Sequence, residues 1–457
     1  MNMLSGIYYP DEGQIFVDGK EVEIRSPKDA FDLHIGMIHQ HFKLVDVFTA
    51  AENIILGLPG DKGKMDKNAV AKAVREIADR YGFDIDPNQK IYEMSVSQKQ
   101  TVEIVKVLYR GADILILDEP TAVLTPQETD RLFQVVRNMR ADGKAIVLIT
   151  HKLHEVLSVS DEVAVLRKGK YIGTVKTSEA TAQSLTDMMV GRAVSLNIDR
   201  PDPVDPKPRL KIEGLTCVDN LGVKRLDDVT FTAMSGEILG IAGIAGSGQR
   251  ELLECITGLY PVEHGTVTFL PEGKPAQQLI GKTPNQIRKA GVAMAFVPED
   301  RLGMGLVGSM GMGSNMMLRS WRKGKGAFVN RRDPNKLAME VMEELEVVTP
   351  SISTPVRRLS GGNVQKVLVG REIAMSPSVL LTAYAVRGLD INTSYTIYNL
   401  LTQQKMKGSA VVFVGEDLDV LLELCDRILV LCGGKISGIV DARTATKEEI
   451  GLLMTKV

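Results

Sequence analysis

The sequence is poor in cysteine, in aromatic residues and in excess charge, and each shortage excludes a class of protein. Four scattered cysteines in 457 residues follow no metal-binding or disulfide spacing, which suits a reducing cytoplasm. The formal net charge of -2 lacks the basic excess of a nucleic-acid-binding protein. Aromatic residues make up only 5% of the chain. No run of eighteen apolar residues exists, so no segment is predicted to span a membrane. At this length, two or three α/β domains are expected.

The stretch from Tyr92 to Glu128 carries the strongest chemical signal. At its centre is ILILDEPT, whose four leading apolar residues predict a buried parallel strand ending in Asp118 and Glu119. Open α/β sheets bind their ligands at the carboxyl ends of strands. Two carboxylates there suit phosphoryl transfer. Asp118 is predicted to hold Mg²⁺, directly or through water, and Glu119 to polarise an attacking water.

The chain contains a tandem repeat. GIYYPDEG at Gly6–Gly13 matches GLYPVEHG at Gly258–Gly265 with an offset of 252. Later positions match with a constant offset of 265: Gln100 with Gln365, Asp118 with Ala383, His151 with Glu416, and Asp161 with Asp426. A constant register through several blocks indicates duplication. We therefore predict two α/β domains, residues 1–194 and 209–457. Between them, residues 195–208 hold four prolines and predict an extended, semi-rigid connector.

The second half contains a strand, a glycine loop and a helix in series, in GEILGIAGIAGSGQRELLECITGL. Gly243, Gly246 and Gly248 let backbone N–H groups close on phosphate oxygens at the helix start. Gln249 and Arg250 stand where such loops carry Lys and Ser/Thr. A lost charged donor removes roughly 1.5–3 kcal/mol of binding, so hydrolysis at this loop is not expected.

The two halves keep different parts of the remaining chemistry. The second half has Ala383 and Tyr384 in place of the carboxylates, and Glu416 in place of His151. Yet its LSGGNVQ keeps a serine and two glycines that suit a helix N-terminus facing a phosphate: Ser360, Gly361, Gly362 and, at the end of the motif, Gln365. In the first half, Val96 and Ser97 replace both glycines.

These motifs resemble the nucleotide-binding subunits of ATP-binding cassette (ABC) transporters over essentially the whole chain. The resemblance implies two P-loop NTPase cassettes of the ABC type, each with a helical subdomain, which use ATP and Mg²⁺. It also implies head-to-tail composite sites, so that Asp118, Glu119 and His151 face Ser360–Gly362 across one ATP. Gln40, in IGMIHQHFKLV, matches the loop glutamine that senses metal and water. The substitutions are then distributed by composite site and not by half. One composite site keeps its motif residues, and the other, around Gln249, has lost them.

The first half is expected to lack its own phosphate loop in the chain as printed. Under the offset of 252, Met1 corresponds to Leu253, which already lies in the helix after the glycine loop. The counterpart of Gly243 to Arg250 would precede Met1. We therefore expect a chain truncated at its N-terminus, without the strand that feeds this loop, and inactive on its own. The alternative is that the first half never had such a loop.

Two further motifs narrow the resemblance. MVGR, which ends at Arg192, and PEDR at Pro298–Arg301 resemble the ATPases of sugar-type importers. His39–Gly57 looks closer to the nucleoside-uptake branch. By resemblance the partners are two transmembrane permeases and, indirectly, an extracytoplasmic solute-binding protein, with no nucleic acid. The subunit would sit on the cytoplasmic face of the plasma membrane.

Two alternatives remain open at this point. A ribosome-associated ABC translation factor is also tandem and lacks membrane spans, but such proteins keep both ATP sites and have a long charged helical linker. A non-catalytic regulatory or assembly protein would also explain a decayed second half. The reading frame upstream of Met1 discriminates: a phosphate loop there favours the enzyme, and a stop codon favours the regulator.

Overall fold

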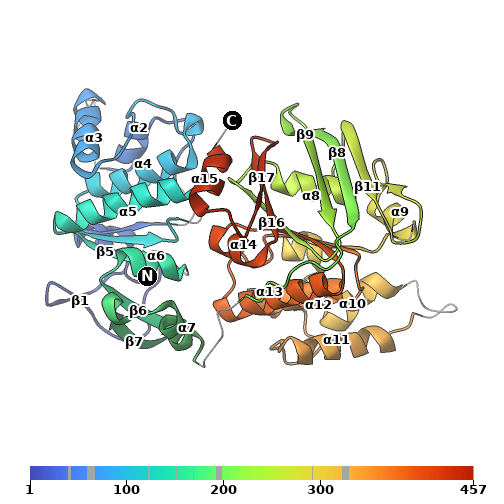
Figure 1. Cartoon of the computed structure of the whole chain (residues 1–457). Coiled ribbons are helices and arrows are strands. Elements are labelled where there is room, and N and C mark those ends of the chain that lie inside the picture. The colour runs from blue at the N-terminus through green and yellow to red at the C-terminus, as the bar shows by residue number, and fades with distance from the viewer. Residues whose placement is uncertain are drawn as a thin grey trace. The chain divides into compact units, whose positions relative to one another are not determined.

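The computed structural model describes residues 1–39, 43–58, 67–121, 124–150, 152–167, 169–191, 198–290, 292–321 and 329–455. The chain divides into two compact units, Met1–Ala193 and Val194–Val457, which are described separately (Figure 1). Across the described ranges, no helix is both long enough and apolar enough to cross a bilayer.

The two units repeat the same series of elements, which confirms the duplication. From β4 onward each strand and α-helix of the first unit recurs 265 residues later with the same length. The pairs are β4 (Ile114–Asp118) and β14 (Val379–Ala383), α5 (Pro126–Ala141) and α13 (Ile391–Met406), β5 (Ala145–Ile149) and β15 (Ala410–Val414), α6 (Leu153–Val159) and α14 (Leu418–Leu424), β6 (Glu162–Arg167) and β16 (Arg427–Cys432), β7 (Lys170–Lys176) and β17 (Lys435–Asp441), and α7 (Ala182–Val190) and α15 (Lys447–Thr455).

The earlier parts of the units also correspond. Gly6 and Gly258 both have positive φ, 73° and 76°, as do Gly13 and Gly265, so the offset of 252 holds in the backbone. The first unit opens with β1 (Ile15–Val17), β2 (Lys20–Val22), α1 (Pro27–Asp32), β3 (Ile35–Ile38), α2 (Ala50–Ile55), α3 (Lys67–Tyr81) and α4 (Val96–Tyr109). The second opens with β8 (Pro208–Val218), β9 (Lys224–Met234), β10 (Ile238–Gly243), α8 (Gln249–Thr257), β11 (His264–Phe269), β12 (Gln277–Gln278), α9 (Pro284–Lys289), β13 (Met294–Val297), α10 (Met312–Ser320), α11 (Arg332–Glu344) and α12 (Gly361–Ile373).

The second unit is built on one six-stranded sheet, in the order β13-β14-β15-β10-β16-β17. All neighbours run parallel except β16 and β17. Alternate residues of β15 enter two different cores: Val411 and Phe413 pack with α12, α13 and α14, whereas Val412 and Val414 pack with α8 and with β8 and β9. A strand buried on both faces explains the unbroken apolar sequence of β15.

The sheet of the first unit is interrupted where β10 lies in the second. Strand β10 pairs with both β15 and β16, but the described residues of the first unit place no strand between β5 and β6. Its strands form separate sheets, β3-β4-β5 and β6-β7. As a result β5 is partly exposed along its whole length, whereas every residue of β15 is buried.

This difference predicts unequal resistance to proteolysis. Among the described residues, strand β5 is an edge strand that pairs only with β4, and it is partly exposed, so less apolar burial holds it in place and the first unit should open more readily. Limited proteolysis of the whole chain should leave a protected fragment that contains the second unit, while residues before it are digested. Equal resistance of the two units would contradict this prediction.

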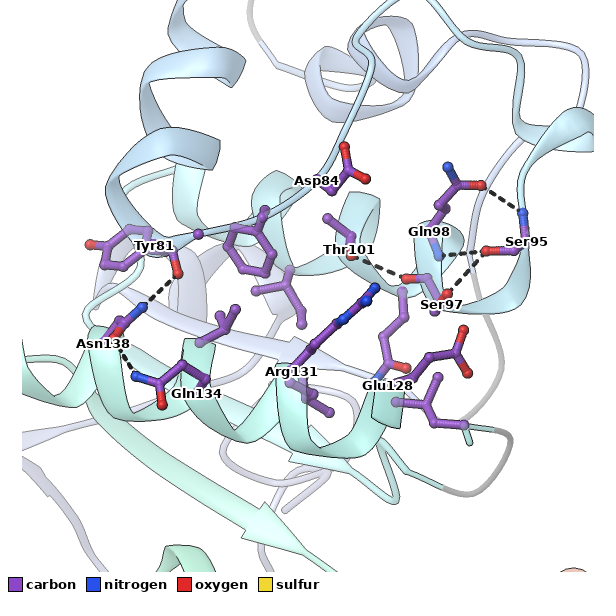
Figure 2. A pocket seen from close by; sticks show the side chains of 17 residues that line it. Tyr81, Asp84, Ser95, Ser97, Gln98, Thr101, Glu128, Arg131, Gln134 and Asn138 are labelled. Atoms are coloured by element: carbon purple, nitrogen blue, oxygen red, sulfur yellow. Dashed lines mark hydrogen bonds between the residues drawn. The ribbon is translucent and has the colours of Figure 1, made fainter. Parts of the chain in front are cut away.

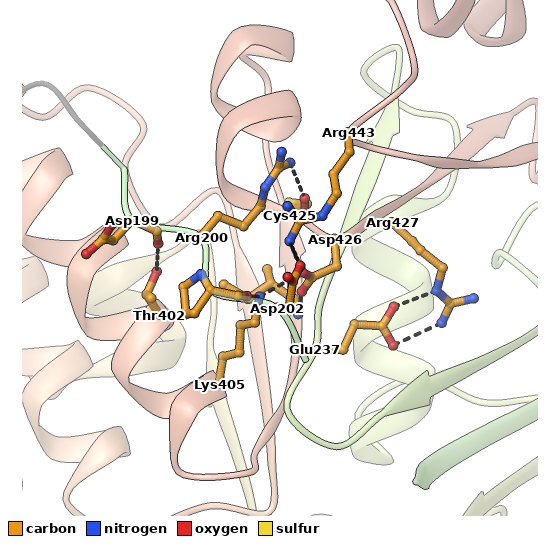
Figure 3. Close-up of polar contacts among 12 residues, drawn as sticks. Asp199, Arg200, Asp202, Glu237, Thr402, Lys405, Cys425, Asp426, Arg427 and Arg443 are labelled. Carbon is orange, nitrogen blue, oxygen red and sulfur yellow. Dashed lines mark hydrogen bonds and ion pairs between the residues drawn. The ribbon is translucent and has the colours of Figure 1, made fainter. Parts of the chain in front are cut away.

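Residues 198–207 belong to the second unit (Figure 3). Ile198 is buried in its core cluster, and β8 begins at Pro208. Polar contacts hold this segment in place. Thr402 Oγ1 donates to the Asp199 carbonyl (3.2 Å), and Lys405 Nζ donates to the Pro201 carbonyl (2.5 Å). Arg200 Nη1 donates to the carbonyls of Leu422 (2.6 Å) and Cys425 (2.8 Å), and Arg443 forms an ion pair with Asp202. The sequence predicts a connector over 195–208. In the structure, the part of this connector from Ile198 onward is held against the second unit by these contacts, so the protected fragment should begin before Ile198.

Candidate functional site

Strand β4 ends at the two carboxylates that the sequence singles out. Leu115, Ile116 and Leu117 are fully buried, and β4 pairs in parallel with β3 on one side and β5 on the other. Asp118 and Glu119 follow, both half-buried. A strand held on both sides therefore presents two acidic side chains at the edge where α/β sheets bind ligands.

The backbone at Glu119 is held in a strained conformation. Its φ is 46°, which is uncommon for a residue other than glycine, and its N–H donates to the Ile149 carbonyl at 2.8 Å. The counterpart Tyr384 repeats this geometry, with φ 50° and an N–H that donates to the Val414 carbonyl at 3.0 Å. Such conformations cost about 1–3 kcal/mol and cluster at functional sites. Both repeats keep the turn and differ in the side chain that it presents.

Gln40 and His151, two residues predicted for this site, lie outside the described residues. Strand β5 places only Thr150, the residue that precedes His151 in the sequence. Ile149, its last residue, pairs with Asp118, so Thr150 lies at the same edge of the sheet as the carboxylates.

Helix α4 begins within Met94–Gln100, the segment of the first unit that corresponds to LSGGNVQ of the second; we call these two segments the degenerate and the intact signature. Ser95 is its N-cap: the side-chain oxygen accepts the N–H of Gln98 (3.3 Å), and Gln98 Oε1 accepts the N–H of Ser95 (2.9 Å). A cavity of about 490 Å³ lies beside this start, between α4 and α5 (Figure 2). On its wall Gln100 donates Nε2 to the Pro120 carbonyl at 2.6 Å. The signature helix is thereby tied to the turn that follows β4.

The glycine loop of the second unit lies between β10 and α8, as predicted. Gly246 and Gly248 have φ of 89° and 101°, conformations that favour glycine. Gln249 is only 2% exposed, and its Nε2 donates to the Ile244 carbonyl at 3.1 Å. A Cβ built on Gly243 would come within 2.5 Å of that nitrogen. Gln249, which stands where such loops carry lysine, is therefore packed inside the loop, whereas the sequence predicts that it contacts the nucleotide.

The intact signature of the second unit starts helix α12. Ser360 is exposed and caps the helix, since its Oγ accepts the N–H of Asn363 (3.4 Å) and the side-chain amide of the same residue (2.9 Å). Gly361 is also exposed, and a Cβ there would lie 3.3 Å from Arg301 Nη1. Together with Gly362, these residues leave an accessible helix start whose partial positive charge suits a phosphate.

Gln365 is placed differently from the prediction. It is 0% exposed, and neither oxygen nor nitrogen of its amide has a hydrogen-bond partner among the described residues. The first turn of α12 faces solvent, but the next turn faces the core, so a side chain five residues after the N-cap points inward. Direct contact with a nucleotide requires an accessible side chain, and Gln365 lacks one here.

An ion-pair cluster in the second unit replaces the carboxylates of the first. Arg387 Nη1 lies 2.6 Å from Glu299 Oε1, and its Nε lies 3.2 Å from Glu416 Oε1. Its guanidinium carbon is 6.0 Å from the centre of the Tyr384 ring. Burial raises the pKa of Tyr384, and the charges of Glu416 and Glu299 raise it further. Tyr384 is therefore a neutral phenol beside a fixed cation.

The comparisons with known proteins agree on one family. The family model described as "ABC transporter" matches residues 1–122 and 226–382. The nucleoside import ATP-binding protein NupA of Lactococcus lactis subsp. cremoris is 41% identical over 99% of this chain and 89% of its own length. The guanosine import ATP-binding protein NupO of Bacillus subtilis is 42% identical over 99% and 88%. A ribose import ATP-binding protein of Rubrobacter xylanophilus is 37% identical over 100% and 89%.

The chain belongs to the ABC transporter family. Its two units are ABC-type cassettes of the P-loop NTPase class, as the sequence predicts, and cassettes of this family bind nucleotide. A solved nucleotide-free ATP-binding cassette from an ABC transporter covers 55% of this chain and 96% of its own, with 21% identity and a TM-score of 0.44.

The two ABC cassettes differ in how well they fit a divalent cation beside the nucleotide. In the first, Asp118 offers a carboxylate oxygen, the ligand type that Mg²⁺ prefers, at the edge where α/β sheets bind ligands. In the second, Ala383 supplies no ligand, and the nearby Glu299 and Glu416 are already paired with Arg387. A fixed guanidinium repels a metal ion, so this cassette does not fit one.

Sequence reasoning missed Arg387. It opens RGLD in the second half and stands at the register of Ala122 in the first, so a gained positive charge was visible in the repeat. Its significance depends on Glu299, which lies 88 residues earlier and has no matching carboxylate at its register in the first half. Only the folded chain shows that the three charged residues meet.

Proposed function

We propose that this chain is the ATP-binding and ATP-hydrolysing subunit of an importer for nucleosides or simple sugars. The observation that carries the proposal is the end of β4, where Asp118 and a backbone-strained Glu119 lie at the ligand edge of the first cassette. The two carboxylates of that turn are absent from the second cassette, whose Arg387 cluster is unsuited to a metal.

Each residue of the kept site is proposed to act on the nucleotide's terminal phosphate. ATP with Mg²⁺, when bound, supplies the phosphoryl group and the cation that offsets its charge. Asp118 holds the cation, directly or through water. Glu119 orients the attacking water and accepts its proton. Gln40 is proposed to sense the metal and the water. His151 donates to the γ-phosphate.

The signature Ser360, Gly361 and Gly362 is proposed to complete this site rather than the degenerate one. The distribution of the substitutions supports this pairing. The cassette that keeps its carboxylates has lost its signature glycines, and the cassette that lost its carboxylates has kept them. The exposed, capped start of α12 offers N–H donors to a phosphate.

The transported solute and the partners are proposed from the relatives. Two of them are named for nucleoside and guanosine import and are 41% and 42% identical, against 37% for the ribose relative. We therefore place the chain nearer nucleoside uptake, on the cytoplasmic face of the membrane, with two permeases and an extracytoplasmic binding protein. The import names of these relatives favour this function over the ribosomal alternative.

Changing Ser360 to Arg should reduce ATP turnover of the assembled transporter by roughly 10²-fold, because a long cation displaces the phosphate from its donors. The matched control is Ser95→Arg, since Ser95 caps the equivalent helix of the other cassette. Both variants lose a cap worth about 0.5–2 kcal/mol, so the loss of capping cancels in the comparison.

Steady-state ATPase activity of the permease complex in lipid is the measurement. Ser95→Arg should keep most of the wild-type rate. If Ser360→Arg is as active as the wild type, the pairing of the two halves is wrong. If the wild-type complex with its binding protein and a nucleoside hydrolyses no ATP above background, the proposed function itself fails.

A further inference from the structure

A buried carboxylate is hydrogen-bonded to the turn that follows Asp118 and Glu119 in the first cassette. Glu155, on α6, is only 1% exposed and receives three donors. Thr121 Oγ1 donates to its Oε1 at 2.6 Å, Thr150 Oγ1 donates to its Oε2 at 3.1 Å, and Lys152 Nζ lies 3.3 Å from Oε1. A buried carboxylate is costly unless it is paired and hydrogen-bonded, and here it is both.

These contacts join two separate segments of the site. Thr121 lies two residues after Glu119, in the turn that β4 feeds. Thr150 and Lys152 lie immediately before and after His151. Lys152 reinforces the junction, since its Nζ also donates to the Thr121 carbonyl at 3.2 Å and its N–H donates to Thr150 Oγ1 at 3.0 Å.

The second cassette builds the same elements without this network. Its equivalents are Val386 for Thr121, Gly415 for Thr150, Asp417 for Lys152 and Val420 for Glu155. Strands β14 and β15 and helix α14 nevertheless have the same lengths as β4, β5 and α6. The fold therefore does not require the buried carboxylate. The network is lost together with the residues proposed for catalysis, Asp118, Glu119 and His151.

We propose that Glu155 is a positioning residue for ATP hydrolysis in the first cassette. Its carboxylate joins the turn after Glu119 to Thr150 and Lys152, and so fixes the position of the group that activates water. Rates of positioned reactions depend steeply on such placement. This inference rests on the proposed function.

Glu155→Gln tests it in the permease complex. Glutamine keeps the shape but loses the charge that holds Lys152, so kcat should fall about tenfold or more while the KM for ATP changes less than twofold. Thr150→Val is a milder second variant, because Thr150 is only half-buried and loses one donor. It should lower kcat several-fold. The control is Ser158→Ala, which removes the Ser158 Oγ bond to the Glu155 carbonyl on the same helix and leaves the carboxylate untouched. Its kcat should match the wild type.

A double variant separates positioning from simple stability. If Glu155 acts through Thr121, then Thr121→Val should add little to the loss of kcat in Glu155→Gln. An unchanged kcat in both Glu155→Gln and Thr150→Val would overturn the inference. So would a loss that only tracks the fraction of folded protein. These outcomes differ from a failure of the proposed function, in which the wild-type complex and Glu119→Gln would hydrolyse ATP at the same rate.

Discussion

Glu119→Gln is expected to lower steady-state ATP turnover of the assembled transporter by about 10²–10⁴-fold, the usual contribution of a positioned general base. Glutamine keeps the size of the side chain, so the strained turn at φ 46° and the N–H bond to the Ile149 carbonyl should survive. What is lost is the ability to accept a proton from water. ATP binding should therefore persist, and the nucleotide-bound state should accumulate.

Tyr384→Phe is the matched control, because Tyr384 occupies the same strained turn in the other cassette. It removes a hydroxyl from a site that does not fit a metal, so turnover should stay within about twofold of the wild type. Radiolabelled ATP trapped by each variant, together with phosphate release, gives both quantities. Equal losses in the two variants would show that the turn is structural in both cassettes and that Glu119 has no special role.

The repeat explains why so much of this architecture is predictable. Each cassette serves as an internal reference for the other, and the offset of 265 relates β4 to β14 and α5 to α13. The apolar run that precedes Asp118 predicts a buried strand, and Ser360 with two glycines predicts a helix start. These features are local, since a few adjacent residues determine each of them.

The features that escape prediction all depend on contacts between distant segments. Arg387 meets Glu299 across 88 residues, and Glu155 meets Thr121 across 34. Whether Gln365 points into the core depends on which face of α12 is covered, and the motif alone does not show that. Residue type determines the chemistry of such side chains, whereas only the packed chain decides which of them share a cluster.

Lys405→Met is expected to destabilise the second cassette by roughly 3–5 kcal/mol, the cost of leaving one partner of a buried ion pair alone. Lys405 is 2% exposed, and its Nζ lies 2.7 Å from Asp426 Oδ1 (Figure 3). Asp426 also accepts the N–H of Ile238, the first residue of β10, at 2.9 Å. Lys405 also donates to the Pro201 carbonyl and so holds residues 198–207 against the second unit. Methionine keeps the apolar stem but removes the nearest cation of the Asp426 carboxylate, and the remaining one, Arg443, lies 4.0 Å from Oδ1.

The duplication supplies the control for this experiment as well. Arg140 and Asp161 stand at the same positions of the first cassette and also form an ion pair, but their side chains are 62% and 63% exposed. Exposed pairs contribute roughly 0–1 kcal/mol, so Arg140→Met should cost little. Trp321, the only tryptophan, lies at the end of α10 and reports unfolding of the second cassette in urea. Lys405→Met should move this transition to clearly lower urea. Arg140→Met lies in the first cassette, whose unfolding is followed by the loss of helical circular dichroism, and there the urea midpoint should stay close to that of the wild type. Similar small shifts in both variants would mean that burial does not strengthen the pair as argued.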